Sequence, residues 1–275
     1  MLFADDTNIF YRGDDPNSIA NIINDDLTLY NDWFLSNKLS LNVSKTNYIV
    51  FGPFGSTWDQ KLQFNNIEIE RVYKTKFLGV FIDSKLSWID HIRHVTFSIS
   101  KGIGIISKFK HFFPRTILRT IYQTLILPHL SYCCTVWSGA KASTLNKLIV
   151  LQKRAIRHIM KVGYRDHTSN LFSSLNLVKL SDLIKINLAT LAYRALHNNL
   201  PSTLNKVFST NNNIHRHYTR QSGNIHCVPC HTTIVRNNPF NLAIDIWNSL
   251  STRVKGCYSL CAFKKNLRKE MLANY

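Results

Sequence analysis

Apolar residues recur at helical spacing through most of the chain after Trp88, and this spacing restricts that part to a mainly helical fold. A repeat every three or four positions gives a helix one apolar face, which is stable only when it packs against other apolar surface. The 45% of residues that are hydrophobic supply enough material for such packing and exclude a wholly disordered chain. The first predicted helix has an apolar face of Ile92, Val95, Ile99, Ile103 and Ile106.

Further helices are predicted beyond the first. The second begins near Pro114, and the fourth starts at Ser181 and ends before Pro201. A short helical stretch follows at residues 240–250, while the Asn-, His- and Ser-rich segment 209–226 predicts a polar loop. The inward-facing positions predicted for the second, third and fourth helices are Ile117, Ile121 and Leu125; Leu145, Leu148, Ile149, Gln152, Ile156 and Ile159; and Ile184, Leu188, Leu191 and Ala195.

The first 87 residues combine one helix with several short strands. Asp15 and Pro16 favour a helix start, and apolar residues at helical spacing continue that helix to Asn37. Short or alternating apolar runs around it predict strands at residues 7–11, 48–51, 67–70 and 77–82. Together with the helices after Trp88, this pattern predicts an α+β fold.

Positive charge is unevenly distributed along the chain. Lys and Arg total 34 against 16 Asp and Glu, for a formal net charge of +18. Residues 1–35 carry −6, and residues 36–275 carry +24. A surface with this excess attracts polyanions, and nucleic acid is the expected polyanion for an intracellular protein. The other interpretation is a generic solubilising surface, and composition does not decide between the two.

The chain start and its least charged stretch bear on localisation. Met1–Asp6 has neither the basic segment nor the apolar core of a signal peptide. Residues 120–140 carry no charge but include Pro128, His129 and several hydroxyl groups, so they favour a buried helix end over a membrane span. We therefore expect an intracellular protein, in the nucleus or cytoplasm, with no membrane partner.

The motif Phe3-Ala4-Asp5-Asp6-Thr7 is the most informative one in the chain. Two adjacent carboxylates at the tip of a β-hairpin suit divalent metal ions, and nucleotidyl transfer uses two Mg²⁺ ions about 3.5–4 Å apart. Asp-Asp pairs are also common in turns. Two more pairs in this chain, at residues 14–15 and 25–26, are interpreted as a helix cap and an exposed helix face.

Six sequence blocks follow one another in a recognisable order. They are Phe3–Thr7; Asn37–Asn42, followed by Lys45-Thr46 and Val50-Phe51; Phe77–Asp83; Leu127–Tyr132 with Trp137; Leu151–Arg157; and Ile246–Leu250 with Phe263-Lys264. In order and spacing the chain resembles the reverse transcriptases of non-LTR (LINE-type) retrotransposons, from the catalytic Asp-Asp box to the chain end. Phe3 departs slightly from the family pattern, which often has Tyr there.

The resemblance implies a fold and an activity. It implies part of a right-hand polymerase palm at residues 1–87, a helical thumb at 88–162 and a C-terminal helical region at 163–275. The implied activity is RNA-directed DNA polymerase, with Mg²⁺ or Mn²⁺ as cofactor. The implied partners are an RNA template, a DNA primer and deoxynucleoside triphosphates.

The resemblance also implies roles for particular residues. Asp5 would be a metal ligand, Asp6 a second, less direct carboxylate, and Lys45 a cation near the incoming triphosphate. The residues expected at the primer are Phe3, Leu78 and Gly79. Taken without the blocks around them, Lys45 is also typical of a surface lysine and Gly79 of a strand bulge.

A basic face is predicted on the third helix after Trp88. Helical spacing places Lys147, Arg154, His158 and Lys161 on one side, with Arg157 at its margin and the apolar residues opposite. Such a face suits sequence-independent contacts with the phosphates of a template–primer duplex. A solvated charged face is the alternative.

The family's polymerase needs a third metal-binding aspartate and the fingers, which in the family lie before the Asp-Asp box. We expect this upstream portion of the same polyprotein to be a partner, and we expect the 275 residues alone not to polymerise DNA. The alternative function is that of a non-catalytic, basic nucleic-acid-binding remnant. A helical protein unrelated to polymerases would leave the six ordered blocks unexplained.

Cysteines offer one further candidate site. Cys227, Cys230, Cys257 and Cys261 could supply four zinc ligands, although the second pair has unusual spacing. The alternative is ordinary reduced thiols, which is the expectation for an intracellular protein. Cys133 and Cys134 lie in an apolar helix end and are expected in the core.

Overall fold

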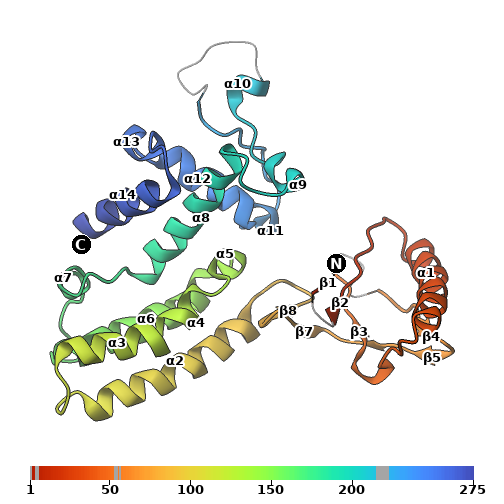
Figure 1. Ribbon diagram of the computed structural model, residues 1–275, viewed down its shortest axis with the longest axis horizontal. Helices are drawn as coiled ribbons and strands as arrows, with labels where there is room; N and C mark the ends of the chain where they lie inside the picture. The colour runs from red at the N-terminus through yellow and green to blue at the C-terminus, as the bar shows by residue number, and fades with distance from the viewer. Residues whose placement is uncertain (1, 4–5, 53–54, 56, 215–222) are drawn as a thin grey trace. The chain divides into compact units, whose positions relative to one another are not determined.

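The computed structural model describes residues 2–3, 6–52, 55, 57–214 and 223–275. The chain forms two compact units, Met1–Ser87 and Trp88–Tyr275, here called the N-terminal unit and the helical unit (Figure 1). The N-terminal unit mixes one helix with short strands, and the described part of the helical unit is helical apart from one isolated antiparallel bridge between Thr210 and Ile225. The predicted α+β class is confirmed at this level.

The strands of the N-terminal unit pair two by two. Three pairs are antiparallel, and the pair β3–β6 is parallel. A two-stranded sheet is only marginally stable by itself, so these pairs depend on further packing, which α1 supplies for β4. The bounds are β1 Leu2–Phe3 with β2 Asp6–Thr7, β3 Asn47–Tyr48 with β6 Glu70–Arg71, β4 Gln63–Phe64 with β5 Ile67–Glu68, and β7 Lys74–Phe77 with β8 Val80–Asp83; a 3₁₀ turn, η1, covers Val43–Lys45.

Helix α1, Pro16–Ser36, confirms the predicted helix of the N-terminal unit. Asp15 caps it, since its carboxylate accepts from the backbone N–H of Ser18 at 2.8 Å, and Pro16 occupies the first turn without losing a hydrogen bond. The helix buries Ala20 in a small core with Trp58, Leu62, Phe64 and Ile69.

The predicted strand at residues 77–82 is wrong, because the structure turns in its middle. Leu78 and Gly79 have φ of 45° and 81°, and Phe77 pairs with Val80 across the resulting two-residue hairpin turn. Positive φ at both central positions gives a turn whose twist matches that of the flanking strands, and glycine adopts it without strain. The other predicted strands are shorter than expected, and the one at 67–70 is split between β5 and β6.

The first part of the helical unit is a group of packed helices around one core. Helices α2 and α6 lie along each other, and α3 packs on both (Figure 1). The predicted face of α2 is confirmed, since Ile92, Val95, Ile99, Ile103 and Ile106 are all buried. The elements are α2 Ile89–Phe109, α3 Arg115–Leu125, α4 Leu127–Ser131, α5 Cys134–Trp137, α6 Ala142–Met160 and α7 Ser169–Ser174.

The predicted apolar face of α3 is rotated relative to the observed one. The helix buries Leu118 and Tyr122, whereas Ile117 and Leu125 are 44% and 40% exposed. Tyr122 can lie in the core because its hydroxyl accepts a 2.8 Å hydrogen bond from the Nε2 of Gln152. A partner for a polar group is invisible to apolar periodicity, which explains the error.

Gln152 also fixes α6 against the chain that leads to α8. Its side chain is 1% exposed, donates to the carbonyl of Val178 at 3.0 Å and accepts from the N–H of Leu180 at 2.8 Å. Satisfied buried polar groups of this kind define one packing arrangement. The outward face of α6 is thereby held in a fixed orientation.

The second part of the helical unit packs α12 and α14 on α8. Its core contains Leu188, Trp247, Phe263 and Leu267, and the short predicted helix at 240–250 is confirmed as α12. Within the loop predicted at 209–226, the structure forms one helical turn, α10; residues 215–222 lie outside the described ranges. The elements are α8 Leu180–Leu196, α9 Ser202–Asn205, α10 Asn211–Ile214, α11 Thr233–Arg236, α12 Pro239–Ser249, α13 Thr252–Lys255 and α14 Leu260–Ala273.

Candidate nucleic-acid interface

The outward face of α6 carries the basic residues that the sequence predicts there. Lys147 and Arg154 are exposed and His158 is half-buried, on the side of the helix opposite Leu148 and Ile156. Lys161 is exposed as well, but it lies one residue beyond the helix end, where φ of 57° makes it the left-handed C-cap. The structure thus keeps Lys147, Arg154 and His158 on one face of α6, here called the basic strip, with Lys161 directly after the end of the helix.

Arg157, at the margin of that strip, has a structural contact. Its Nε donates to the carbonyl of Asp166 at 2.9 Å, and the carboxylate of Asp166 accepts from the N–H of Gly163 at 2.8 Å. These two bonds close the turn that follows α6. Arg157 therefore positions the end of the strip and has less freedom than Arg154 to reach a ligand.

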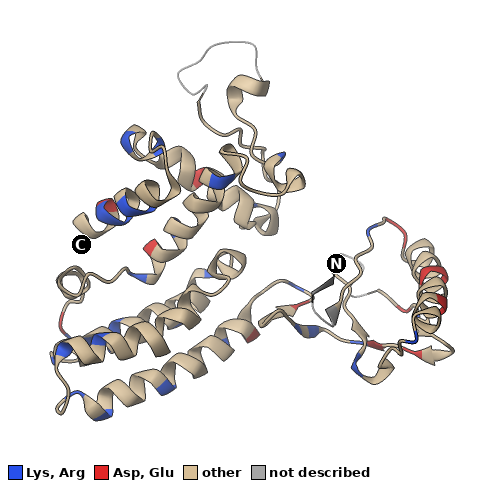
Figure 2. Cartoon of the chain, viewed as in Figure 1, with Lys and Arg blue, Asp and Glu red and all other residues tan. Residues whose placement is uncertain are grey.

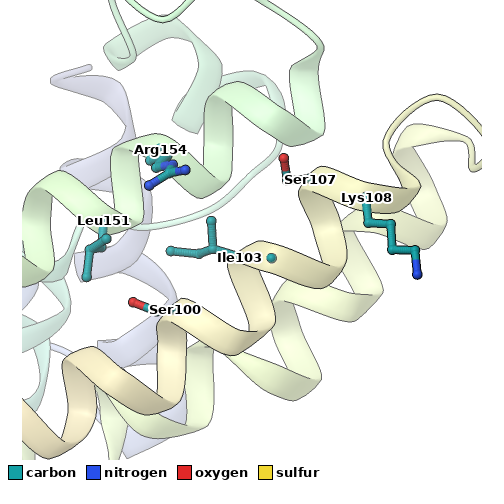
Figure 3. Close-up of a pocket in the computed structure, with 7 residues that line it drawn as sticks. Ser100, Ile103, Ser107, Lys108, Leu151 and Arg154 are labelled. Carbon is teal, nitrogen blue, oxygen red and sulfur yellow. The ribbon is translucent and has the colours of Figure 1, made fainter.

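A groove of about 350 Å³ lies between α2 and α6, beside the basic strip (Figure 3). Ser100 and Ser107 of α2 face Arg154 and Leu151 of α6, while Lys108 stands at the rim and points away. We call this the α2–α6 groove. Its full lining is Ser100, Ile103, Gly104, Ser107, Lys108, Leu151 and Arg154.

The α2 wall of the groove was not predicted from the sequence. Ser100, Gly104 and Ser107 recur at spacings of four and three, which places small side chains in one row along the helix. This row leaves room beside α6. The Ser107 hydroxyl adds a hydrogen-bond donor to the charges there, whereas the Ser100 hydroxyl donates to the carbonyl of Thr96 at 2.7 Å. A row of small residues along the edge of the apolar face was the signal that could have found it.

His158, one turn beyond Arg154, has a ring nitrogen without a hydrogen-bond partner among the described residues. This nitrogen, Nε2, is shielded from solvent. Burial lowers the pKa of the His158 imidazole, and the positive charges of Lys110 and Arg154 lower it further. The ring is therefore neutral at pH 7, and an anion bound beside it would favour its protonation.

Electrostatics separate the two units. The helical unit has 26 Lys and Arg against five Asp and Glu, a net of +21, and the N-terminal unit has eight against 11, a net of −3 (Figure 2). With five carboxylates in the helical unit, most of its bases cannot pair within it. Such an excess attracts a polyanion and makes its binding sensitive to salt.

The predicted catalytic residues lie in the N-terminal unit. Asp5 lies outside the described residues, and Asp6 belongs to β2, where its backbone pairs with Phe3 of β1. Lys45 ends the 3₁₀ turn η1 and is exposed, with its N–H donating to the carbonyl of Asn42 at 3.1 Å. Leu78, also predicted at the primer, lies with Gly79 at the tip of the β7–β8 hairpin.

The proposed zinc ligands are not brought together. Across the described ranges, no three His, Cys, Asp or Glu side chains lie close enough to hold a metal ion. The thiol of Cys227 lies 3.8 Å from a carboxylate oxygen of Asp245 in α12, whereas the sulfur of Cys257 accepts from Asn266 in α14 at 3.3 Å. Cys227 and Cys230 contact α12, whereas Cys257 contacts α14 and Cys261 belongs to it. The structure therefore does not bring the four cysteines together as the zinc hypothesis requires.

The cysteines at 133 and 134 differ from each other. Cys134 is buried, as predicted, and burial raises the pKa of its thiol to about 11. Cys133 is half-buried with φ of 48°.

In the part of the chain that the structure describes, no helix has the length and apolar character needed to cross a membrane.

Comparison with known proteins supports the sequence blocks. The chain is 23% identical over 190 residues to a probable RNA-directed DNA polymerase from the transposon X-element of Drosophila melanogaster, which is 66% of this chain and 20% of that protein. It is 25% identical over 189 residues to the RNA-directed DNA polymerase of the mobile element jockey, and 24% identical over 179 residues to the probable enzyme of transposon BS, both from the same fly.

The chain thus spans about a fifth of the length of these relatives, with 66%, 66% and 64% of it aligned. No family model and no solved structure matches it. The relatives nevertheless agree in kind, since each is named an RNA-directed DNA polymerase of a mobile element. The chain is therefore similar to the RNA-directed DNA polymerases of non-LTR retrotransposons, and the predicted resemblance is confirmed.

Proposed function

We propose that this chain is part of an RNA-directed DNA polymerase of a non-LTR retrotransposon. In this proposal residues 1–87 belong to the palm, 88–162 form the thumb and 163–275 form a C-terminal region. The similarity to three polymerases of mobile elements supports it, as does the order of the sequence blocks. The single structural observation that carries it furthest is the basic strip of α6 beside the α2–α6 groove.

The chemistry of the proposed polymerase rests on Asp5, Asp6 and Lys45. Carboxylate oxygens are the ligands that Mg²⁺ and Mn²⁺ prefer, so the donor set fits such ions. Bound there, the metal pair would activate the primer 3′-hydroxyl and neutralise the leaving pyrophosphate. Lys45 would place a further positive charge at that pyrophosphate, and its exposure leaves it free to do so.

The helical unit would hold the template–primer duplex through its phosphates. Arg154, Lys147 and Lys161 would contact the backbone from α6, and Ser107 would donate a hydrogen bond from the facing wall. These contacts carry no sequence information, as copying of arbitrary sequence requires. Phe3, Leu78 and Gly79 would lie at the primer end.

A binding experiment tests the proposed interface. Fluorescence anisotropy of a labelled RNA–DNA hybrid should show affinity that falls steeply with salt. The variant Lys147→Ala/Arg154→Ala/Lys161→Ala should bind about tenfold or more weakly and lose about 2–3 from the salt slope, which is about 0.9 per phosphate contact. The control variant Lys85→Ala/Lys206→Ala/Arg236→Ala removes the same charge from exposed positions elsewhere.

The control should retain most of the affinity and slope. Equal losses in both triple variants would show that net charge alone drives binding, and affinity that does not change with salt would contradict the proposal. A primer-extension assay with Mg²⁺ or Mn²⁺ tests the catalytic part. We expect no extension by the 275-residue protein, and extension that Asp5→Ala abolishes would overturn this expectation.

A further inference from the structure

A second basic surface lies on α14, within the region 163–275. The helix buries Phe263 and Leu267 in the core with α8 and exposes four basic residues, in two adjacent pairs. Its exposed bases are Lys264, Lys265, Arg268 and Lys269. Its single acid, Glu270, accepts a 3.2 Å hydrogen bond from Ser251, and the three lysines have no carboxylate partner among the described residues.

Neighbouring residues extend this surface and limit it. Arg253 of α13, which packs on α14, is exposed and adds a charge. Arg268 and Lys255 are engaged, since Arg268 donates to the carbonyl of Asn176 at 2.6 Å and Lys255 donates to the carbonyl of Asn248 at 3.1 Å. Burial accordingly lowers the pKa of Lys255. The freely available charges are therefore those of Arg253 and the three lysines.

Tyr258 lies between α13 and Ser259, the N-cap of α14, and its whole side chain is in solvent, at 101% exposure. The residue before it is held from two sides. The carbonyl of Cys257 accepts from the Tyr193 hydroxyl at 3.0 Å, and its sulfur accepts from Asn266 of α14 at 3.3 Å. Asn266 is three positions from Lys269 along the helix, so the two lie on adjacent turns of one side.

A fully exposed aromatic ring on an anchored backbone, between a helix that carries Arg253 and a helix that carries three exposed lysines, has the composition of a stacking site for nucleic-acid bases. Cations neutralise phosphates, and the ring offers a π-face to a base. Only an unpaired base can use that face, because the bases of a duplex already stack on one another. A lipid surface is a poorer fit, since the described residues of α14 expose no large apolar side chain for insertion.

We propose that Tyr258 and the lysines of α14 bind single-stranded nucleic acid. A base stacks on the Tyr258 ring, while Lys264, Lys265, Lys269 and Arg253 contact the adjoining phosphates. This α14 surface is separate from the α2–α6 groove in the residues that form it. The inference does not depend on polymerase activity, because it rests on this surface alone.

Fluorescence anisotropy with one mixed sequence, prepared as single-stranded RNA, single-stranded DNA and RNA–DNA hybrid, tests the proposal. Tyr258→Ala should weaken single-strand binding about fivefold or more, and Tyr258→Phe should preserve it because the ring remains. Tyr73→Ala, a second exposed tyrosine in the N-terminal unit, is the matched control and should have no effect.

Lys264→Gln/Lys265→Gln/Lys269→Gln should lower the single-strand salt slope by about 2, at about 0.7 per phosphate contact. If the variants bind single-stranded RNA and single-stranded DNA equally weakly, the surface accepts both. If they lose affinity for one of the two alone, that nucleic acid is the ligand of the surface. Unchanged single-strand binding in Tyr258→Ala and in the lysine variant would overturn the proposal. It would also fall if the lysine variant lost binding only to vesicles containing phosphatidylserine.

The same reagents separate this proposal from the polymerase interface. The α6 triple variant should lose hybrid binding while it keeps single-strand binding, and the α14 variants should show the reverse. Equal loss of both ligands in the α14 variants would contradict a separate single-strand site while leaving the proposed duplex interface untouched.

Discussion

The two units of the chain bury their apolar residues to very different extents. The N-terminal unit has one small core of five buried apolar residues and sheets of two strands each. Its helix α1 leaves Ile22, Leu29 and Trp33 exposed along one side, at 51%, 67% and 55%. The helical unit instead surrounds two extensive cores and buries the apolar face of every long helix.

This difference indicates which of the two units is the more stable by itself. Helices connected by short loops satisfy their backbone hydrogen bonds internally and need neighbours only for burial, which the helical unit supplies. Two-stranded sheets leave strand edges open and depend on further packing. We therefore expect the helical unit to unfold at higher denaturant concentration than the N-terminal unit, and the variants below test that comparison.

The largest expected effect is in the core of the helical unit. Ile106→Ala removes a side chain with 0% exposure and should lower the free energy of unfolding by about 2–5 kcal/mol. The neighbouring Ile105, at 40% exposure, is the matched control, and Ile105→Ala should cost less than about 1 kcal/mol. Urea unfolding followed by far-ultraviolet circular dichroism measures both. Equal costs would break the claim that the α2 face is a packed core.

The next effect concerns pH. His91, buried beside Trp137, has its pKa lowered from 6.5 to about 4, mainly by burial and then by His94. The unfolded chain therefore takes up the proton first, so stability is full above pH 6.5 and falls as pH drops toward 4, by up to about 3 kcal/mol. His91→Gln should remove this part of the pH dependence, whereas His129→Gln, at an exposed site, should leave it. Identical pH profiles for the two variants would contradict the assignment.

The smallest effect is in the β7–β8 hairpin of the N-terminal unit. Gly79→Ala places a side chain at φ of 81° and should destabilise the hairpin by about 1–2 kcal/mol. Leu78→Asn should cost nothing, because asparagine tolerates the left-handed conformation that Leu78 adopts with φ of 45°. Amide hydrogen exchange in peptides covering residues 74–83 measures both. Faster exchange in the asparagine variant would argue against the turn.

The helices show how far periodicity reaches. The face of α2 was predictable because five branched apolar residues repeat in one register with no competing pattern. On α3 the periodicity pointed to Ile117, but Tyr122 is buried because Gln152 satisfies its hydroxyl. Helix α14 was not predicted at all, since its outward bases interrupt the few apolar positions, Phe263 and Leu267 among them.

The candidate site was predictable only in part. The spacing of residues along one helix determines which of them share a face, so the basic strip of α6 could be predicted from Arg154 and its neighbours. The α2 wall of the groove depends on which helix packs against α6, and that is a property of the tertiary structure. The zinc hypothesis has the same weakness. Cys227 and Cys257 are of a residue type that binds metal ions, but in the folded chain they contact different helices, α12 and α14.

The central claim is that the helical unit, through α6 and the α2–α6 groove, holds a nucleic-acid duplex. Amide hydrogen exchange of the 275-residue protein, with and without a short RNA–DNA hybrid, tests it most directly. We predict slower exchange on hybrid binding in peptides covering residues 100–110 and 147–161, with no change in α1. Slowing confined to the N-terminal unit, or unchanged exchange along α6 under conditions where the hybrid is bound, would contradict the account.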